Sequence, residues 1–122
     1  MTVRPGTDKL LAKAERLARG AETALAEGAP DLAAGRAFSA MLNAAKARLN
    51  ESGVSLRTHA RIARAYETLP EVDSAPAVWL RDALALRGTL AKEGDGLEFA
   101  EAEALVARAR HFVNAVMLRP TR

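Results

Sequence analysis

The chain has 122 residues, a formal net charge of +3 and no cysteine, which excludes disulfides, thiolate metal sites and a cysteine nucleophile. Its length suits one domain, and hydrophobic residues make up 49% of the sequence although aromatic residues make up only 4%. These values favour closely packed helices of alanine, leucine and valine, since sheets prefer β-branched and aromatic residues. We therefore expect one all-α domain over residues 1–122, an up-and-down antiparallel bundle of about five helices.

The first two predicted helices form a hairpin. Residues 1–6 are expected to be a flexible arm, because a Pro-Gly pair opposes helix formation. Thr7 is the predicted N-cap of the first helix, whose apolar period ends near Gly28. Asp31 follows a proline directly and is the predicted cap of the second helix. The link is short, so the two helices should run antiparallel.

The stretch from Asp31 to Leu69 combines a strong helical period with many basic residues. Apolar residues recur at steps of three and four on either side of Ser52-Gly53, which predicts two helices joined by a sharp turn. Residues 36–64 contain six arginines or lysines and one glutamate, so their local charge is +5. This clustering indicates a phosphate-binding patch. Solvated arginines on alanine-rich helices are the alternative interpretation.

Two more helices are predicted after this stretch. Pro70 should end the third helix, and Ser74 with Pro76 marks the start of the fourth. Gly94-Asp95-Gly96 is a predicted loop before a fifth helix that begins near Glu98. This fifth helix has the cleanest amphipathic stripe and is interpreted as scaffold. The stripe comprises Ala102, Leu105, Val106, Ala109, Phe112, Val113 and Val116.

Two short runs carry a family resemblance. Arg36-Ala37-Phe38 lies on the second predicted helix, and Thr58-His59 opens the third. The HEPN domain of prokaryotes, especially its small stand-alone members, has an Arg-Ala-aromatic-aromatic-Ala run and a Thr-His pair at these places. The final helix also resembles the closing helix of that family, so the likeness covers nearly the whole chain. Ser39 departs from the pattern, which commonly has a second aromatic residue there.

The resemblance implies a helical bundle, usually dimeric, that is linked to nucleotides or RNA and often to a partner nucleotidyltransferase in a toxin–antitoxin-type system. Active ribonuclease members carry an Arg and a His separated by four to six residues, which joins charge stabilisation to proton transfer. Neither His59 nor His111 has an arginine at the required place. No zinc, Walker or dinucleotide-binding pattern is present, so no metal or other cofactor is predicted.

Four residues form the predicted nucleotide- or RNA-phosphate site: Arg36, Arg57, His59 and Arg61. Arg57 and Arg61 flank His59, and each guanidinium can donate two parallel hydrogen bonds to one phosphate. His59 is either a phosphate donor at a helix start or a packed structural histidine. Arg36 either reaches an anion or ties two helices together. Phe38 and Tyr66 are expected in the core rather than stacked on bases.

The leading functional hypothesis is a cytoplasmic, homodimeric module that binds a nucleotide or RNA phosphate without cleaving it. Trp79 is interpreted as part of the dimer surface because of its size. The first alternative is a pure protein-interaction or dimerisation module, in which the arginines only keep the surface soluble. The second is a divergent ribonuclease toxin that uses His59 with Arg36. No apolar run approaches the ~20 residues of a spanning helix, and the N-terminus lacks the apolar core of a secretory signal.

Overall fold

Five helices make up the computed structural model, which describes residues 4–69, 74–93 and 97–118, without the side chains of residues 74, 88–93 and 118. They are α1 (Thr7–Ala26), α2 (Pro30–Glu51), α3 (His59–Glu67), α4 (Ser74–Glu93) and α5 (Phe99–Leu118). No strand occurs in the described ranges. The prediction of an all-α bundle of about five helices is confirmed.

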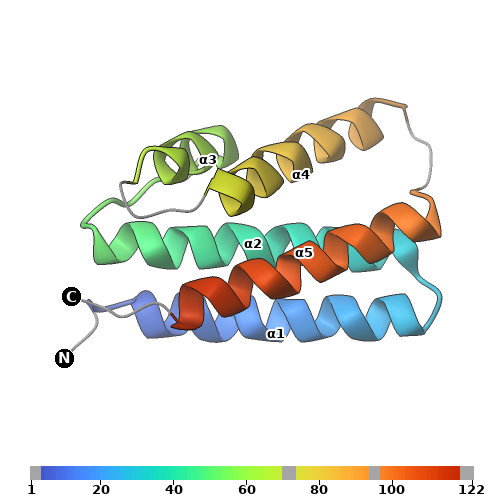
Figure 1. Ribbon diagram of the computed structural model, residues 1–122, viewed down its shortest axis with the longest axis horizontal. Coiled ribbons are helices and arrows are strands. Elements are labelled where there is room, and N and C mark those ends of the chain that lie inside the picture. The colour runs from blue at the N-terminus through green and yellow to red at the C-terminus, as the bar shows by residue number, and fades with distance from the viewer. Residues whose placement is uncertain (1–3, 70–73, 94–96, 119–122) are drawn as a thin grey trace.

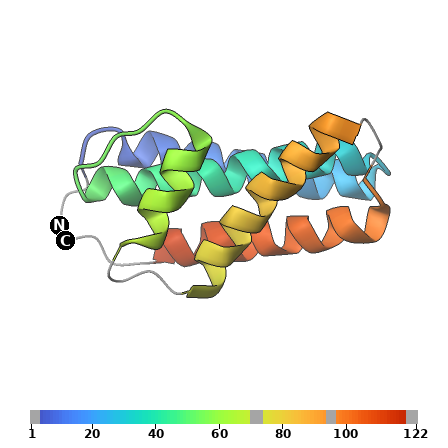
Figure 2. The same cartoon turned by 90° about the horizontal axis from the view of Figure 1, so that it is seen from above.

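The helices form two layers (Figure 1). α1, α2 and α5 lie along one another in the first layer, and each of these three contacts the other two. α3 and α4 form the second layer, and Figure 2 shows them crossing the long helices obliquely. α2 runs antiparallel to α1 and in the same direction as α5. The second layer therefore brings residues of α4 close to residues of α2 and α3.

Glycines close the first two helices where the sequence predicts them. Gly28 and Gly53 have φ angles of 78° and 80°, a left-handed conformation that glycine adopts at little cost. The amide that follows each glycine donates to the carbonyl five residues earlier, at 2.9 Å in both helices. These paired bonds end α1 and α2 and turn the chain sharply, so the predicted hairpin is confirmed.

Two predicted N-caps are wrong, because their side chains bond to distant elements. Gly6, with a φ of 94°, caps α1, whereas Thr7 lies inside the helix and its hydroxyl donates to Glu51 Oε2 at 2.6 Å. Asp31 makes no cap bond to α2. Its Oδ1 instead accepts a hydrogen bond from the Leu97 amide at 2.8 Å, directly before α5. The spacing of residues near a helix start does not reveal hydrogen-bond partners that lie far along the chain.

The core around α1 and α2 is built largely from alanine. Ten alanines of these two helices are at most 1% exposed: Ala14, Ala18, Ala21, Ala24, Ala33, Ala37, Ala40, Ala44, Ala45 and Ala47. Small side chains allow helix axes to lie close together, because the backbones meet with little between them. All seven residues of the stripe predicted on α5 are buried. Phe112 lies at its centre and packs on Tyr66 of α3, with ring centroids 5.1 Å apart.

The remaining predicted boundaries are matched as far as the described residues allow. α4 begins at Ser74, and α5 begins one residue after Glu98. Pro70 and Gly94-Asp95-Gly96 lie outside the described residues. Part of the predicted arm is attached to the end of α2, since the Arg4 amide donates to Glu51 Oε2 at 2.7 Å. Among the described helices, none is both long and apolar enough to cross a membrane.

Candidate functional site: a junction at His59

Arg36 ties α2 to α1. Its Nη1 donates to the Gly20 carbonyl oxygen at 3.2 Å, and its Cδ would lie 3.2 Å from a Cβ at position 20. Glycine at this position therefore makes room for the arginine side chain. Arg36 and Phe38 are two residues apart on α2, so their side chains point about 200° apart around the helix. Of the two roles predicted for Arg36, the one observed in the structure is the link between two helices.

Arg57 and Arg61 are exposed. Arg57 precedes α3, and Arg61 lies two positions after His59, on the opposite side of that helix. His59 faces α2, because its ring packs against Phe38 with centroids 5.5 Å apart. Arg61 therefore faces away from this contact, and Arg36 lies across α2 from it. The structure does not bring the four predicted site residues together around one ligand.

Instead, His59 lies where α2, α3 and α4 meet. Arg87 of α4 places its guanidinium over the Phe38 ring, 5.0 Å from the centroid. Its Nη1 is 3.0 Å from His59 Nδ1. The guanidinium can only donate, so Nδ1 accepts and the proton of the neutral imidazole is on Nε2. We call Phe38, Lys46, His59 and Arg87 the His59 junction.

The charged groups among the described residues that act on His59 are positive. Burial lowers the pKa of His59 below its ordinary value of 6.5, and the charges of Arg87 and Lys46 lower it further. His59 is therefore neutral at pH 7. Within the described part of the chain, neither Arg87 nor Lys46 forms an ion pair with a carboxylate. Among the described residues, no acidic side chain pairs with the positive charge of the junction.

Neither cation of the junction was predicted from the sequence as a site residue. Lys46 is one of the basic residues in the +5 stretch, so the charge count contained its signal. Arg87 is 28 residues away from His59 in the chain and lies in a helix without a comparable basic cluster. The crossing of α4 over α2 brings it to the site, and a crossing angle has no local sequence signature.

The aromatic residues of this region are not available to stack on bases. Phe38 is 4% exposed and Tyr66 is 5% exposed, so the prediction that both belong to the core is confirmed. A cavity near Lys46, lined also by Asn50 and Ser55, has a volume of about 40 Å³. This is far below the several hundred Å³ of small-molecule pockets. The junction offers charge and hydrogen-bond donors rather than a base pocket.

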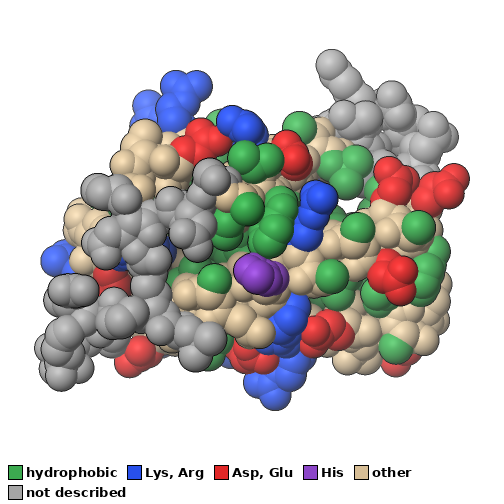
Figure 3. Space-filling model, in the orientation of Figure 1, with side chains coloured by type: hydrophobic (Ala, Val, Ile, Leu, Met, Phe, Trp, Pro, Cys, Tyr) green, Lys and Arg blue, Asp and Glu red, His purple; other side chains and the backbone are tan. Residues whose placement is uncertain are grey.

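A second candidate surface is the α4–α5 groove, a hollow of about 210 Å³ between these two helices. Trp79 lies in it, packed against His111 at 5.1 Å between centroids, with the Arg108 guanidinium 5.9 Å from the indole centroid. Figure 3 shows hydrophobic side chains at the surface between the two layers, next to charged groups. The groove is lined by Trp79, Asp82, Ala83, Leu86, Glu101, Ala104, Leu105 and Arg108.

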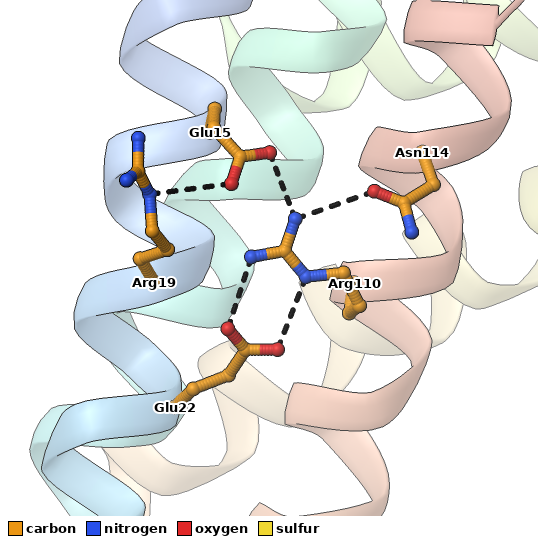
Figure 4. Close-up of polar contacts among 5 residues, drawn as sticks. All are labelled: Glu15, Arg19, Glu22, Arg110 and Asn114. Atoms are coloured by element: carbon orange, nitrogen blue, oxygen red, sulfur yellow. Dashed lines mark hydrogen bonds and ion pairs between the residues drawn. The ribbon is translucent and has the colours of Figure 1, made fainter.

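A charged cluster between α1 and α5 has a structural role. Arg110 of α5 bonds Glu22 of α1 through two parallel contacts of 2.9 and 3.0 Å, and its Nη1 reaches Glu15 at 2.8 Å (Figure 4). These contacts lower the pKa of Glu22, chiefly through the hydrogen bond from Arg110. Because two carboxylates already satisfy it, this guanidinium holds α5 against α1 and is not offered to a ligand.

The described residues contain no group of three or more His, Cys, Asp or Glu side chains placed to hold a metal ion. In comparisons with known proteins, no protein family matches the chain and no curated protein is similar to it. A functional assignment therefore depends on the charge and geometry of the His59 junction.

Proposed function

We propose that the chain is a cytoplasmic helical module that binds the phosphate backbone of RNA at the His59 junction and through the exposed Arg57 and Arg61. The similarity of Arg36-Ala37-Phe38 and Thr58-His59 to HEPN domains supports this ligand class. It also supports a nucleotidyltransferase as a proposed partner. Arg36 acts in this proposal as a link between helices and not as a ligand-binding residue.

The contact between Arg87 and His59 is the observation that carries the proposal. It holds two nitrogen-rich groups 3.0 Å apart, next to Lys46 and without a carboxylate partner among the described residues. Arg87 has further N–H donors, His59 has Nε2–H, and Lys46 has an ammonium group. Phosphate oxygens accept hydrogen bonds from such donors, and the phosphate charge offsets the positive charge of Arg87 and Lys46.

A polymer suits this surface better than a single nucleotide. Arg57 and Arg61 lie outside the junction, so they cannot grip the same phosphate as Arg87, but they can contact others along one strand. With Phe38 and Tyr66 buried, base stacking would contribute little. Contacts with phosphates alone position a strand without reading its sequence. Binding should therefore be strongly salt-dependent and nearly independent of sequence.

The proposal includes no cleavage of the bound strand. A ribonuclease centre made of His59 and Arg36 would require both side chains at one phosphate, and they lie on different sides of α2. Nδ1 of His59 is also engaged by Arg87. Labelled RNA incubated with the protein should remain intact on a gel, and cleavage lost in His59→Ala would revive the ribonuclease alternative.

Arg87→Gln should weaken the binding of a short oligouridylate by about threefold to tenfold and reduce the salt slope by about one. The variant removes one phosphate-binding cation and leaves a side chain of similar length. Fluorescence anisotropy over a series of salt concentrations, starting at low salt, measures both values.

Arg16→Gln is the matched control, because Arg16 is an exposed arginine of α1 and its loss changes the net charge equally. It should leave affinity nearly unchanged. Equal weakening in the two variants would show that net charge alone governs binding, and absence of binding to the wild-type protein at low salt would end the proposal.

A second candidate function is self-association through the α4–α5 groove, which is compatible with RNA binding. Exposed Val78 lies next to Trp79 on α4, and the groove has both acidic and basic residues. A surface that carries both charge signs can be complementary to itself across a twofold axis. This proposed homodimer corresponds to the alternative hypothesis of a pure protein-interaction or dimerisation module.

Trp79→Ala should convert a dimer of the chain to a monomer in light scattering at micromolar concentration, because a large anchoring side chain is lost from the interface. Leu32→Ala is the control, since Leu32 is 49% exposed and lies on α2, outside the residues that line the groove. Circular dichroism checks that both variants stay helical. A wild-type protein that is monomeric under these conditions would remove the dimer proposal.

A further inference from the structure

His59 can change its charge near neutral pH, whereas the arginine and lysine beside it cannot. Its partly buried ring contacts two other helices. α2 contributes Phe38 and Lys46, and α4 contributes Arg87. On its own helix, the nearest charged residue, Arg61, points to the opposite side. The charged groups that face His59 from the described residues are thus Lys46 and Arg87, and both are positive.

Protonation of His59 is unfavourable while no anion is bound. Nδ1 accepts the hydrogen bond from Arg87 at 3.0 Å. An added proton would turn this acceptor into a donor, which breaks the bond and places two cations against each other. Both groups also pack on the Phe38 ring, which holds them beside each other.

A bound phosphate reverses this balance. Its oxygens accept hydrogen bonds from an imidazolium and a guanidinium at once, and its negative charge lies between the two cations. Phosphate therefore raises the affinity of His59 for a proton. Linkage is reciprocal, so the proton must raise the affinity for phosphate by the same factor.

We infer that His59 couples RNA binding to proton uptake, so that affinity for the RNA backbone rises as pH falls through the range in which this histidine titrates. The inference rests on the proposed function and adds its regulation. The junction would hold RNA more tightly under mildly acidic conditions than at neutral or alkaline pH, without any change in fold.

The test uses an oligouridylate of about ten nucleotides without terminal phosphates, because neither uracil nor a phosphodiester titrates near neutral pH. At constant ionic strength, the affinity of the wild-type protein should rise about threefold to tenfold between pH of about 7.5 and 5.5, since uptake of one full proton gives at most tenfold per pH unit. The label must be insensitive to pH, and the buffer must contain no phosphate.

His59→Gln keeps an N–H donor but cannot gain a proton, so its affinity should not change with pH. His111→Gln is the matched control, because it removes the chain's other histidine, which packs on Trp79 in the second surface. This variant should keep the wild-type pH dependence. NMR titration of the His59 ring should give a higher midpoint with the oligonucleotide than without it.

The outcomes separate the inference from the proposed function. RNA binding with the same pH dependence in the wild type and in His59→Gln, or an unchanged His59 midpoint, would overturn proton coupling while RNA binding stands. Absence of RNA binding at every pH would overturn the proposed function and, with it, the coupling. Rising affinity that disappears only in His59→Gln would support both.

Discussion

Phe112→Ala should lower the free energy of unfolding by about 4 kcal/mol, the range found when a fully buried phenylalanine is truncated. Phe112 is 0% exposed and is among the largest fully buried side chains. The chain has only three phenylalanines, one tyrosine and one tryptophan, so few large groups fill its interior. The buried alanines that make up much of the core are short and cannot extend into the space. Chemical denaturation at neutral pH measures this change.

Phe99→Ala is the control for this prediction. Phe99 lies at the start of the same helix but is 48% exposed, so its truncation should change the free energy of unfolding by less than about 0.5 kcal/mol. In Phe112→Ala, hydrogen exchange should also accelerate in α3, because Tyr66 loses the ring on which it packs. Similar losses in both variants would contradict the packing that we describe for α5.

Arg110→Met should lower the free energy of unfolding by about 2 kcal/mol at pH 7, since it removes charge-assisted bonds that hold α5 to α1. The value is moderate because Glu22 is 43% exposed and solvent screens part of the interaction. Methionine keeps the aliphatic bulk, so the change isolates the guanidinium. A double-mutant cycle with Glu22→Gln should give a coupling energy that is a large part of this loss.

Acid should reduce the effect of Arg110→Met. Arg110 lowers the pKa of Glu22 in the folded protein, so the pair stabilises the fold above the ordinary glutamate pKa of 4.5 and loses this contribution as pH falls below it. The difference in unfolding free energy between wild type and variant should therefore shrink in acid. Arg19→Met, a change at a 69% exposed arginine, should have little effect at either pH. A difference that persists unchanged in acid would exclude the ion pair as its cause.

The number and order of helices could be predicted because their signals are local. The helix ends are marked by Gly28 and Gly53, which lie next to the residues that they affect. The apolar stripe of α5 likewise involves only residues within a few turns of one another. The caps failed for the opposite reason, since Thr7 and Asp31 bond to residues 44 and 66 positions away. A side chain that could satisfy its own helix can equally satisfy another one, and sequence spacing does not decide between them.

The candidate site was predicted only in part. His59 and the concentration of positive charge around it followed from the sequence, but Arg87 did not, because it reaches His59 from another helix, 28 residues further along the chain. Arg36 was grouped with His59 because both matched the same family pattern. Its position opposite Phe38 on α2 turns it toward Gly20. The helical period alone places Arg36 and Phe38 on different sides of α2, so the sequence already contained the reason not to group Arg36 with His59.

The alanine contacts between α1 and α2 do little to fix the axial position of one helix along the other. A surface of methyl groups is shallow, and the buried alanines recur every three or four residues on both helices, so a shift by one turn would place methyl groups opposite methyl groups again. Directional bonds must then fix the axial position. Glu51 fixes the axial position at one end by accepting hydrogen bonds from Arg4 and Thr7. Arg36 fixes it further along the pair, because its side chain packs over Gly20 of α1.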